Sequence, residues 1–399
     1  MSLKGKRIIL GITGSVAAYK GVEVLRELQR RGAEVRAAIT PAGKAFIGLL
    51  TLEALTGQPV YHEVIPESGK EIPHTSLAQW GELLIVAPAT ANTIAKMACG
   101  IADTPVTELA LCLGRGIVAP AMNVRMYESP LTQKNLKRLK ELGWEVVEPG
   151  SGYLACGESG RGRLAEVKEI VEAAEYWFYP KLLKGKKVVI TAGPTREYID
   201  PVRFISNPSS GRMGYALAKA AAGMGAEVVL ISGKTCLEPP YKVKRIEVET
   251  VEEMKEAALR EFKEADVYIS AAAIGDYTPA ERSSKKIKKG KGELLIKLKR
   301  APDILKLIGQ RKREGQVVVG FAAETDNLIE NAKDKLKRKN LDLIVANLVS
   351  DGVFGSSKTR VSILDKGGNV LEAEGSKEEV ALEILKRISS ILGDSAPKG

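Results

Sequence analysis

The chain begins the same structural pattern twice. Residues 6–10 (KRIIL) run into GITGSVAAYK, and residues 187–191 (KVVIT) run into AGPT and then NPSSGRMG. A second strand-like run follows each start, RGAEVRAAIT at 31–40 and MGAEVVLISG at 224–233. A strand, a glycine turn and a helix start form a phosphate cradle, because glycine lets the backbone approach and the helix N-terminus presents free N–H groups. Two such starts predict two nucleotide or flavin sites in one polypeptide.

Strand-like apolar runs alternate with helical patterns in both halves of the chain, which predicts parallel sheets covered on both faces. The segment 179–187 (YPKLLKGKK) combines proline, glycine and lysines and is the best boundary between the halves. We therefore predict two α/β domains, 1–180 and 181–399, each a Rossmann-like or flavodoxin-like αβα sandwich with a mostly parallel sheet. The expected strands are 7–10, 35–40, 83–87, 116–119, 145–147, 188–191, 227–232, 267–271, 294–298, 317–321, 343–346 and 359–364.

The formal net charge of +11 does not indicate a nucleic-acid-binding protein. Lysine and arginine are spread along the chain and mixed with glutamate, and neither an RNA-type aromatic motif nor a zinc-ligand spacing occurs. Four cysteines without a CxxC pair are typical of a reducing compartment. No apolar run is long enough to span a bilayer. We expect a cytoplasmic protein that binds neither nucleic acid nor membranes.

Polar residues follow the expected strands of the first half. Thr90 and Asn92 come after strand 83–87, where ligands bind in open parallel sheets, so they are candidates to donate to a phosphate or a flavin ring. The alternative is capping of the next helix. Asn123 follows the next strand, where its amide suits a carboxylate, or it is an ordinary turn residue. His74 is either an acid or base beside a ligand, or an exposed loop or helix-capping histidine.

The stretch 150–163 (GSGYLACGESGRGR) is rich in glycine and poor in bulky apolar residues. We expect a mobile loop there that acts as a lid. Cys156 lies in this loop, and a cysteine outside a core is a candidate reactive thiol.

The second half carries candidate groups for an anionic nucleotide. Ser209, Ser210 and Gly211 precede a helix, so they form either an anion cradle or an ordinary N-cap. Small residues at 271–273 leave room for a base or ribose, and Asp276 is a candidate for binding a hydroxyl group or Mg²⁺.

Lysines are concentrated at two further places. Lys286 and Lys288 flank Ile287 in SSKKIKKGKG, a run that is either a solvated loop or a site for a triphosphate. Lys335 and Lys339 are four residues apart and therefore share a helix face.

The motifs of the first half form a specific set. GITGSVAAYK, His74 before PATANT, PAMNVRMY and GSGYLACG resemble the flavin-dependent cysteine decarboxylases, and in particular the phosphopantothenoylcysteine decarboxylase domain. The resemblance implies that FMN binds at a subunit interface, that His74 is catalytic, that Asn123 holds the substrate carboxylate and that Cys156 reprotonates the reduced intermediate. It implies FMN contacts at Gly14, Ser15, Thr40, Ala89, Thr90 and Asn92.

Two positions depart from this family's pattern. Tyr127 stands where some relatives have Trp, and Thr104-Pro105 stands where relatives usually keep apolar helix residues. We expect the second departure to disturb the local helix start and to leave the chemistry intact.

The motifs of the second half resemble phosphopantothenate–cysteine ligase. They include ITAGPTREYIDPVRFISNPSSGRMG, SAAAIGDY, KKIKK, VGFAAET and KLKRKNLDLIVAN. The resemblance implies CTP as co-substrate and Mg²⁺, bound in part by Asp276. It implies that Asn207 grips the acyl-cytidylate and Lys286 stabilises triphosphate charge. The implied CTP contacts are Ser209, Ser210, Gly211, Ala271, Ala272, Ala273, Asp276, Lys286, Pro302, Asp303, Ile304, Leu305, Phe321, Lys335 and Lys339. Leu348 follows Asn347 where relatives often have an acid, and we expect this to alter nucleotide affinity.

In their order the two resemblances imply the bifunctional bacterial enzyme family of coenzyme A biosynthesis. Its substrates are 4′-phosphopantothenate, cysteine and CTP, and its members form trimer-based homo-oligomers up to dodecamers. One alternative is a flavin-binding regulatory protein, but the chain lacks an acidic tail and keeps its catalytic residues. Another is an NAD-dependent dehydrogenase, but there is no clean GxGxxG and the second strand ends in Thr40 instead of an acid.

Overall fold

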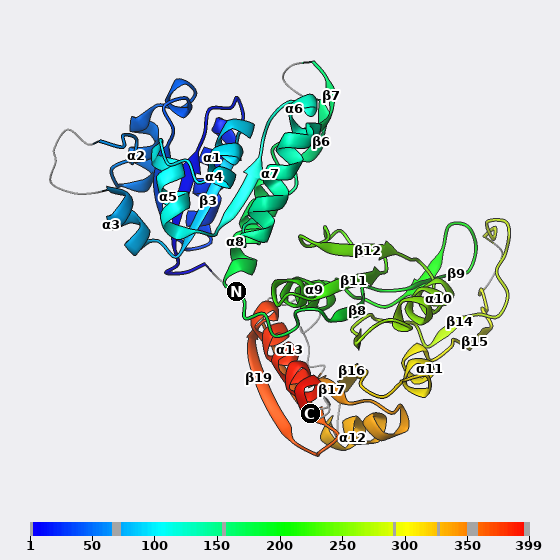
Figure 1. Cartoon of the computed structure of the whole chain (residues 1–399). Coiled ribbons are helices and arrows are strands. Elements are labelled where there is room, and N and C mark those ends of the chain that lie inside the picture. Colours follow the sequence, from blue (N-terminus) through cyan, green and yellow to red (C-terminus); the bar gives the residue numbers. More distant parts are fainter. Residues whose placement is uncertain are drawn as a thin grey trace. The chain divides into compact units, whose positions relative to one another are not determined.

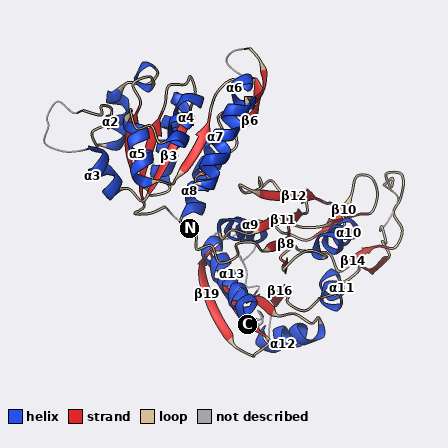
Figure 2. Ribbon diagram, viewed as in Figure 1, coloured by secondary structure: helices blue, strands red, loops and turns tan. Residues whose placement is uncertain are grey.

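A computed structural model of the chain describes residues 3–65, 73–153, 157–289, 293–324, 328–348 and 358–394. The chain divides into two compact units between Phe178 and Tyr179 (Figure 1). Each unit has its own sheet with helices packed on it (Figure 2).

The N-terminal unit contains a five-stranded parallel sheet in the order β2-β1-β3-β4-β5. This is the flavodoxin-like order, in which the strand order reverses between β1 and β3. A crevice at that reversal, outside the carboxyl ends of the strands, is where such sheets bind ligands. The strands are β1 (Arg7–Ile12), β2 (Glu34–Ile39), β3 (Leu83–Ala89), β4 (Ile117–Pro120) and β5 (Glu145–Val146).

Helices cover both faces of this sheet. Ile94, Val106 and Leu136, from three helices, share one apolar cluster with Ile9 and Leu84 of the strands. Helices α1 and α8 contact each other, and α1 lies against Ile12 and the Ala87 carbonyl on the other face. The helices are α1 (Ala18–Arg30), α2 (Leu49–Thr56), α3 (Pro73–Trp80), α4 (Ala91–Cys99), α5 (Pro105–Leu113), α6 (Val124–Glu128), α7 (Pro130–Glu141) and α8 (Val167–Trp177).

The expected disturbance at Thr104-Pro105 is wrong. Thr104 is the N-cap of α5 and forms a capping box with Thr107, and Pro105 occupies the first helical turn. Proline is favoured there because its missing N–H would have no partner in the helix. These residues therefore start the helix.

The C-terminal unit contains an eight-stranded sheet in the order β12-β11-β8-β13-β16-β17-β18-β19. The first six of these strands are parallel and follow the Rossmann order 3-2-1-4-5-6, while β18 and β19 pair antiparallel at the edge. The two-domain α/β fold class predicted from the sequence is thus confirmed. The strands are β8 (Lys187–Ala192), β11 (Glu227–Ser232), β12 (Val243–Glu247), β13 (Val267–Ser270), β16 (Val317–Glu324), β17 (Leu343–Leu348), β18 (Lys358–Asp365) and β19 (Val370–Ser376).

In the described part of this unit, five helices pack on the sheet. Residues of α10, α11 and α12 share one buried cluster with Val189 and Val318 of the strands, whereas α9 and α13 contact each other. These helices are α9 (Arg212–Gly223), α10 (Val251–Phe262), α11 (Ile304–Gln310), α12 (Leu328–Arg338) and α13 (Lys377–Asp394). In the described part of the chain, none of the helices combines the length and apolarity needed to cross a bilayer.

Two short hairpins stand outside the main sheet. They are β9 (Arg196–Tyr198) with β10 (Phe204–Ser206), and β14 (Tyr277–Pro279) with β15 (Leu298–Arg300). The strand expected at 294–298 is therefore wrong: pairing begins only at Leu298. The apolar run before it is exposed and does not enter the core.

Candidate functional site

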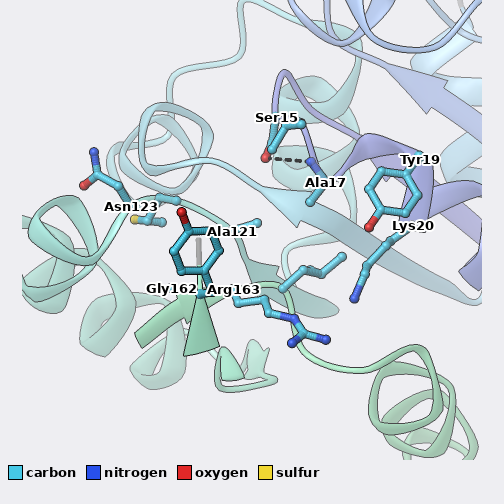
Figure 3. Close-up of a pocket in the computed structure, with 12 residues that line it drawn as sticks. Ser15, Ala17, Tyr19, Lys20, Ala121, Asn123, Gly162 and Arg163 are labelled. Carbon is cyan, nitrogen blue, oxygen red and sulfur yellow. Dashed lines mark hydrogen bonds between the residues drawn. The ribbon is translucent and has the colours of Figure 1, made fainter. Parts of the chain in front are cut away.

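A pocket of about 520 Å³ lies at the carboxyl ends of β1 and β4 (Figure 3). Ser15, Tyr19 and Lys20 line it from the turn and helix after β1, and Asn123 lines it from the loop after β4. Tyr153 and Arg163 complete the wall from a hairpin described below. Two cations and two tyrosines around a helix start suit a planar aromatic ligand that carries a phosphate.

Thr13 connects the two strand ends that flank the switch point. Its buried hydroxyl donates to the Pro88 carbonyl at 2.7 Å and accepts from the Thr90 N–H at 3.1 Å. Next to it, a Cβ on Gly14 would lie 2.5 Å from the Cβ of Ala42, so only glycine fits this turn. The Thr40 N–H donates to the Ile12 carbonyl at 3.0 Å. The structure therefore brings Gly14, Thr40 and Thr90 to one edge of the sheet.

The other residues predicted to contact FMN differ in what they can offer a ligand. The Ser15 hydroxyl accepts from the Ala17 N–H at 3.2 Å, at the start of α1. The Thr90 hydroxyl accepts from the Thr93 N–H, so the capping interpretation of Thr90 is confirmed. Ala89 is fully buried, and Asn92 is exposed on the first turn of α4. The Thr90 hydroxyl is therefore engaged in capping α4, whereas the Asn92 side chain is exposed and can contact a ligand.

Asn123 caps α6 and still offers its amide NH₂ group. Its Oδ1 accepts from the Met126 N–H at 2.8 Å, which leaves the Nδ2 group to donate to a ligand in the pocket. An amide donor at this place suits a carboxylate, and the substrate contact of Asn123 stays a prediction.

The expected loop at 150–163 is a β-hairpin. Strand β6 (Gly150–Tyr153) pairs antiparallel with β7 (Ser159–Arg163), and the Met122 N–H donates to the Gly162 carbonyl at 3.0 Å. A Cβ on Gly160 would lie 2.7 Å from Val124, so the glycines let the hairpin lie close to α6. The glycines of this stretch are therefore needed because side chains there would clash with the segment around Val124. Cys156 lies outside the described residues.

Tyr127 of α6, which stands where some relatives have Trp, contacts Glu148 in the segment after β5. Its hydroxyl donates to Glu148 Oε2 at 2.5 Å, and Glu148 also accepts from Lys140 at 2.7 Å. Burial and this hydrogen bond raise the pKa of Tyr127 to about 12. The Arg161 guanidinium of β7 lies 5.5 Å from the Tyr127 ring centre, so Tyr127 also supports the hairpin.

His74 lies in the first turn of α3, so the loop position considered for it is wrong. Its Nδ1 lies 3.2 Å from Oε2 of Glu108 in α5, and Oε2 also accepts from the Tyr61 hydroxyl. Burial and the neighbouring Glu108 raise the pKa of Tyr61. Asn123 lines the described pocket, and His74 is not among its lining residues.

The C-terminal unit gathers small residues at the switch point between β8 and β13. The Ala273 N–H donates to the Gly193 carbonyl at 2.9 Å, and the Ala272 N–H donates to the Thr191 hydroxyl at 3.3 Å. Gly211, the N-cap of α9, lies close to Gly193 at the end of β8. Its φ of 74° lies in the left-handed region, which favours glycine. The Ser209 hydroxyl accepts from the Gly211 N–H at 3.3 Å, and Ser210 is exposed. Backbone N–H groups of a helix start thus adjoin the predicted base-binding residues.

Asn207 lies between these two groups. Its Nδ2 donates to the Ile274 carbonyl at 3.2 Å, which connects the β10 end to the loop after β13. Asp276 is exposed, and its backbone carbonyl accepts from the Ala301 N–H at 2.9 Å. The described residues contain no cluster of three or more His, Cys, Asp or Glu that could hold a metal alone. A magnesium ion that is bound mainly by nucleotide phosphates does not need such a cluster.

A second set of predicted nucleotide residues meets at α11 and the end of α12. Asp303 caps α11 through the Lys306 N–H at 3.0 Å, and its other carboxylate oxygen lies 2.9 Å from Nζ of Lys339. This pairing brings Lys339 to the start of α11, where Pro302, Ile304 and Leu305 also lie. Phe321 lies in β16 and Lys335 in α12, and both are half-buried. Lys286 is exposed in the loop after the β14 strand.

Several residues at these sites escaped the sequence analysis. Thr13, Lys20 and Arg163 belong to the pocket region, and in the other unit the buried Asp200 pairs with the exposed Arg203. A threonine between the glycines of GITG was a usable signal for the first. Lys20 ends the quoted motif GITGSVAAYK, and Asp200 and Arg203 pair three residues apart inside a quoted motif, so local signals existed for them as well. The place of Arg163 depends on how its hairpin packs, which no local pattern reveals.

Comparisons with known proteins match both units. Residues 1–178 match the Flavoprotein family, and residues 183–392 match the DNA/pantothenate metabolism flavoprotein C-terminal domain. The coenzyme A biosynthesis bifunctional protein CoaBC of Haemophilus influenzae is 44% identical over 97% of this chain and 98% of its own length. The chain belongs to the family of bifunctional coenzyme A biosynthesis proteins. The family membership predicted from the two sets of motifs is confirmed, and the regulatory and dehydrogenase alternatives find no support.

Two further proteins are similar to this chain. A cysteine/cysteine sulfinic acid decarboxylase from an unidentified prokaryote is 47% identical over 86% of this chain and 99% of its own length. The crystal structure of a C-terminal domain of a CoaBC protein is 45% identical, covers 54% of this chain and 99% of its own, and has a TM-score of 0.47.

Proposed function

We propose that the chain ligates cysteine to 4′-phosphopantothenate with CTP and then decarboxylates the product to 4′-phosphopantetheine. The ligase is assigned to residues 181–399 and the FMN-dependent decarboxylase to residues 1–180. The observation that carries this proposal is the similarity to a bifunctional relative across 97% of the chain, which includes both units.

FMN suits the pocket at the carboxyl ends of β1 and β4. The tight Gly14 turn and the start of α1 suit a phosphate, and Lys20 and Arg163 add positive charge. Glu166 lies 3.8 Å from Lys20 and 2.6 Å from Arg163, and so offsets part of that charge. When bound, FMN supplies a two-electron acceptor that oxidises the substrate thiol, so that the electrons left by departing CO₂ have a sink.

The chain's own residues take three roles in the decarboxylation. Asn123 Nδ2 donates to the substrate carboxylate, His74 acts as an acid or base, and Cys156 supplies the final proton. Because His74 is not in the pocket of its own chain, we propose that a second copy contributes it. This agrees with a trimer-based homo-oligomer, with a dodecamer as the larger assembly, in the cytoplasm.

The ligase reaction needs positive charge and a fixed acyl group. The carboxylate of 4′-phosphopantothenate attacks the α-phosphate of CTP, pyrophosphate leaves, and the cysteine amine then displaces CMP. Lys286 stabilises the triphosphate charge, and Asn207 holds the acyl-cytidylate. Asp276 offers an oxygen ligand to Mg²⁺ at the phosphates. The contact of Asp303 with Lys339 supports a role for both beside the nucleotide.

The testing experiment uses the purified full chain. Its absorbance spectrum is recorded, and 4′-phosphopantothenate, cysteine and Mg²⁺ are added with either CTP or ATP while pyrophosphate and CO₂ are followed. We expect a flavin spectrum, CTP-dependent pyrophosphate, and CO₂ only after ligation. A protein without flavin absorbance that releases neither pyrophosphate nor CO₂ would refute the proposal.

Free cysteine is a second candidate substrate for the N-terminal unit, because the 47% identical relative carries the name of a cysteine/cysteine sulfinic acid decarboxylase. Cysteine alone, without 4′-phosphopantothenate or CTP, serves as the discriminating assay. CO₂ from cysteine alone would favour this second activity. CO₂ only from phosphopantothenoylcysteine would exclude it.

A further inference from the structure

Asp200 is fully buried at the turn of the β9–β10 hairpin. Its Oδ1 accepts from the Val202 and Arg203 N–H groups, both at 2.8 Å, and this fixes the turn. Its Oδ2 accepts from the Arg203 guanidinium, at 2.9 Å from Nε and 2.5 Å from Nη2. Although burial opposes it, the guanidinium and the backbone donors hold the pKa of Asp200 well below its usual range. The guanidinium and the backbone N–H groups therefore stabilise the anionic form of this carboxylate.

The same carboxylate also reaches the lysine loop. The Ile287 N–H donates to Asp200 Oδ2 at 3.1 Å, and the Ile287 carbonyl accepts from Arg203 Nη2 at 2.7 Å. A third bond, from the Ser283 N–H to the Ile199 carbonyl at 2.9 Å, fixes the start of the loop. One ion pair thus holds both backbone groups of a single residue some eighty positions away in sequence.

Charge explains why a backbone contact is needed here. The lysines on either side of Ile287 are exposed and repel one another, which favours a spread loop when no anion is present. A side-chain ion pair would hold the loop but would also consume a cation. Asp200 and Arg203 grip the Ile287 backbone and leave the ammonium groups of Lys286 and Lys288 for a ligand.

The hairpin also reaches the nucleotide edge. At its base, the Ser206 hydroxyl donates to the Thr195 carbonyl at 2.8 Å, and the next residue is Asn207. The Thr195 hydroxyl accepts from the Gly275 N–H at 3.1 Å, in the loop after β13. One short hairpin therefore carries Asn207 at its base and the lysine loop at its turn.

We propose that Asp200 is a positioning residue for the ligase reaction, which acts by holding Lys286 over the triphosphate through the backbone of Ile287. This inference rests on the proposed function, since it requires that Lys286 contacts the nucleotide. Misplacing a charge by about 1 Å costs on the order of 100-fold in rate, so the loss should appear mainly in kcat.

The test compares four full-length proteins: wild type, Asp200→Asn, Lys286→Ala and the double variant. The amide of Asp200→Asn keeps an oxygen for the turn and loses the oxygen that binds Ile287. We expect hydrogen exchange at the Ile287 amide to accelerate at least about tenfold in Asp200→Asn. We expect kcat for pyrophosphate release to fall roughly 10- to 100-fold, with a smaller change in KM for CTP. In the Lys286→Ala background the same substitution should change kcat by less than about twofold.

Asp365→Asn is the matched control, because Asp365 is also buried and also binds an arginine, Arg387, and a backbone N–H, that of Asn369. It should leave exchange at Ile287 and pyrophosphate release unchanged. Unchanged exchange in Asp200→Asn would overturn the proposed contact. Equal losses of kcat with and without Lys286 would mean that Asp200 only stabilises the hairpin, and would overturn the positioning role. If Lys286→Ala retained full activity, the role of Lys286 would fail together with this inference, while the exchange result would still report on the contact.

Discussion

At the scale of single residues, the contacts of His74 define what it needs in order to act. Its Nδ1 faces Glu108, which also binds the Tyr61 hydroxyl. His74 Nδ1 makes no hydrogen bond within the described part of the structure, but a carboxylate oxygen 3.2 Å away can orient the ring by its charge and leaves the other nitrogen for proton transfer. Glu108 is therefore expected to matter for decarboxylation although it touches no substrate.

The first prediction concerns this carboxylate. Glu108→Gln should lower the rate of CO₂ release about 10- to 100-fold, as losses of orienting groups around histidines do. Pyrophosphate release in the same preparation is the internal control, because the ligase lies in the other unit and should keep its rate. A variant with full CO₂ release would show that His74 does not depend on Glu108.

The second prediction concerns pH and Tyr127. Its pKa is raised to about 12 in the folded chain, above the value of about 10 of an unfolded tyrosine. The folded state thus keeps a proton that the unfolded state loses, so this contribution to stability is complete below about pH 10 and is lost as pH rises through about 12. Denaturant unfolding of wild type and Tyr127→Phe should show a stability difference that shrinks across this window. A difference that stays constant from pH 8 to 12 would contradict the assignment.

At the scale of elements, α9 depends on a close approach to β8. A Cβ on Gly214 would lie 2.5 Å from the Cβ of Ala192 and 3.1 Å from the Thr191 carbonyl. The helix start that carries Ser209–Gly211 therefore reaches the strand end only because residue 214 has no side chain.

The third prediction follows from this contact. Gly214→Ala should destabilise the C-terminal unit by roughly 1–3 kcal/mol, because overpacking forces the backbone to move, and should weaken CTP binding. Gly393→Ala is the control, because a Cβ at Gly393, near the end of α13, meets nothing within 4 Å. That change should be neutral or stabilising by up to about 1 kcal/mol. Denaturant midpoints and CTP titration measure both effects, and equal behaviour of the two variants would refute the argument.

At the scale of the whole molecule, each unit has its own sheet and its own buried clusters. Units with separate cores fold and act as separable parts of one chain. The proposed reactions should therefore be separable by single substitutions.

The fourth prediction tests this separation. Cys156→Ser should reduce steady-state CO₂ release by at least about 100-fold, because without the final proton the cycle stops after about one CO₂ per site, and it should leave pyrophosphate release unchanged. Lys286→Ala should do the reverse. Pyrophosphate is measured with 4′-phosphopantothenate, cysteine and CTP, and CO₂ is measured with phosphopantothenoylcysteine supplied directly, so that a lost ligase does not remove the decarboxylase's substrate. Each full-length variant controls for the folding of the other. Loss of both products in either variant would show that the two units do not act independently.

The sequence alone determined the repeated strand–turn–helix starts, the two-domain α/β class and the family. These depend on local periodicity and on motifs that are contiguous in the chain. Local reasoning was weaker wherever one segment packs on another. Pro105 begins a helix, because Thr104 caps it, and the glycine-rich stretch around Gly160 and Gly162 pairs as a hairpin, because its missing side chains let it lie against α6.

Only the tertiary structure decided which residues meet. The hydroxyl of Thr13 joins two strand ends, Glu108 faces His74, and the buried Asp200 holds Ile287 from across the unit. Such contacts join positions that are tens of residues apart, and their energy depends on burial and hydrogen-bond geometry that exist only after the chain has folded. A sequence specifies which groups are available for chemistry, whereas the packing of sheets and helices determines their partners.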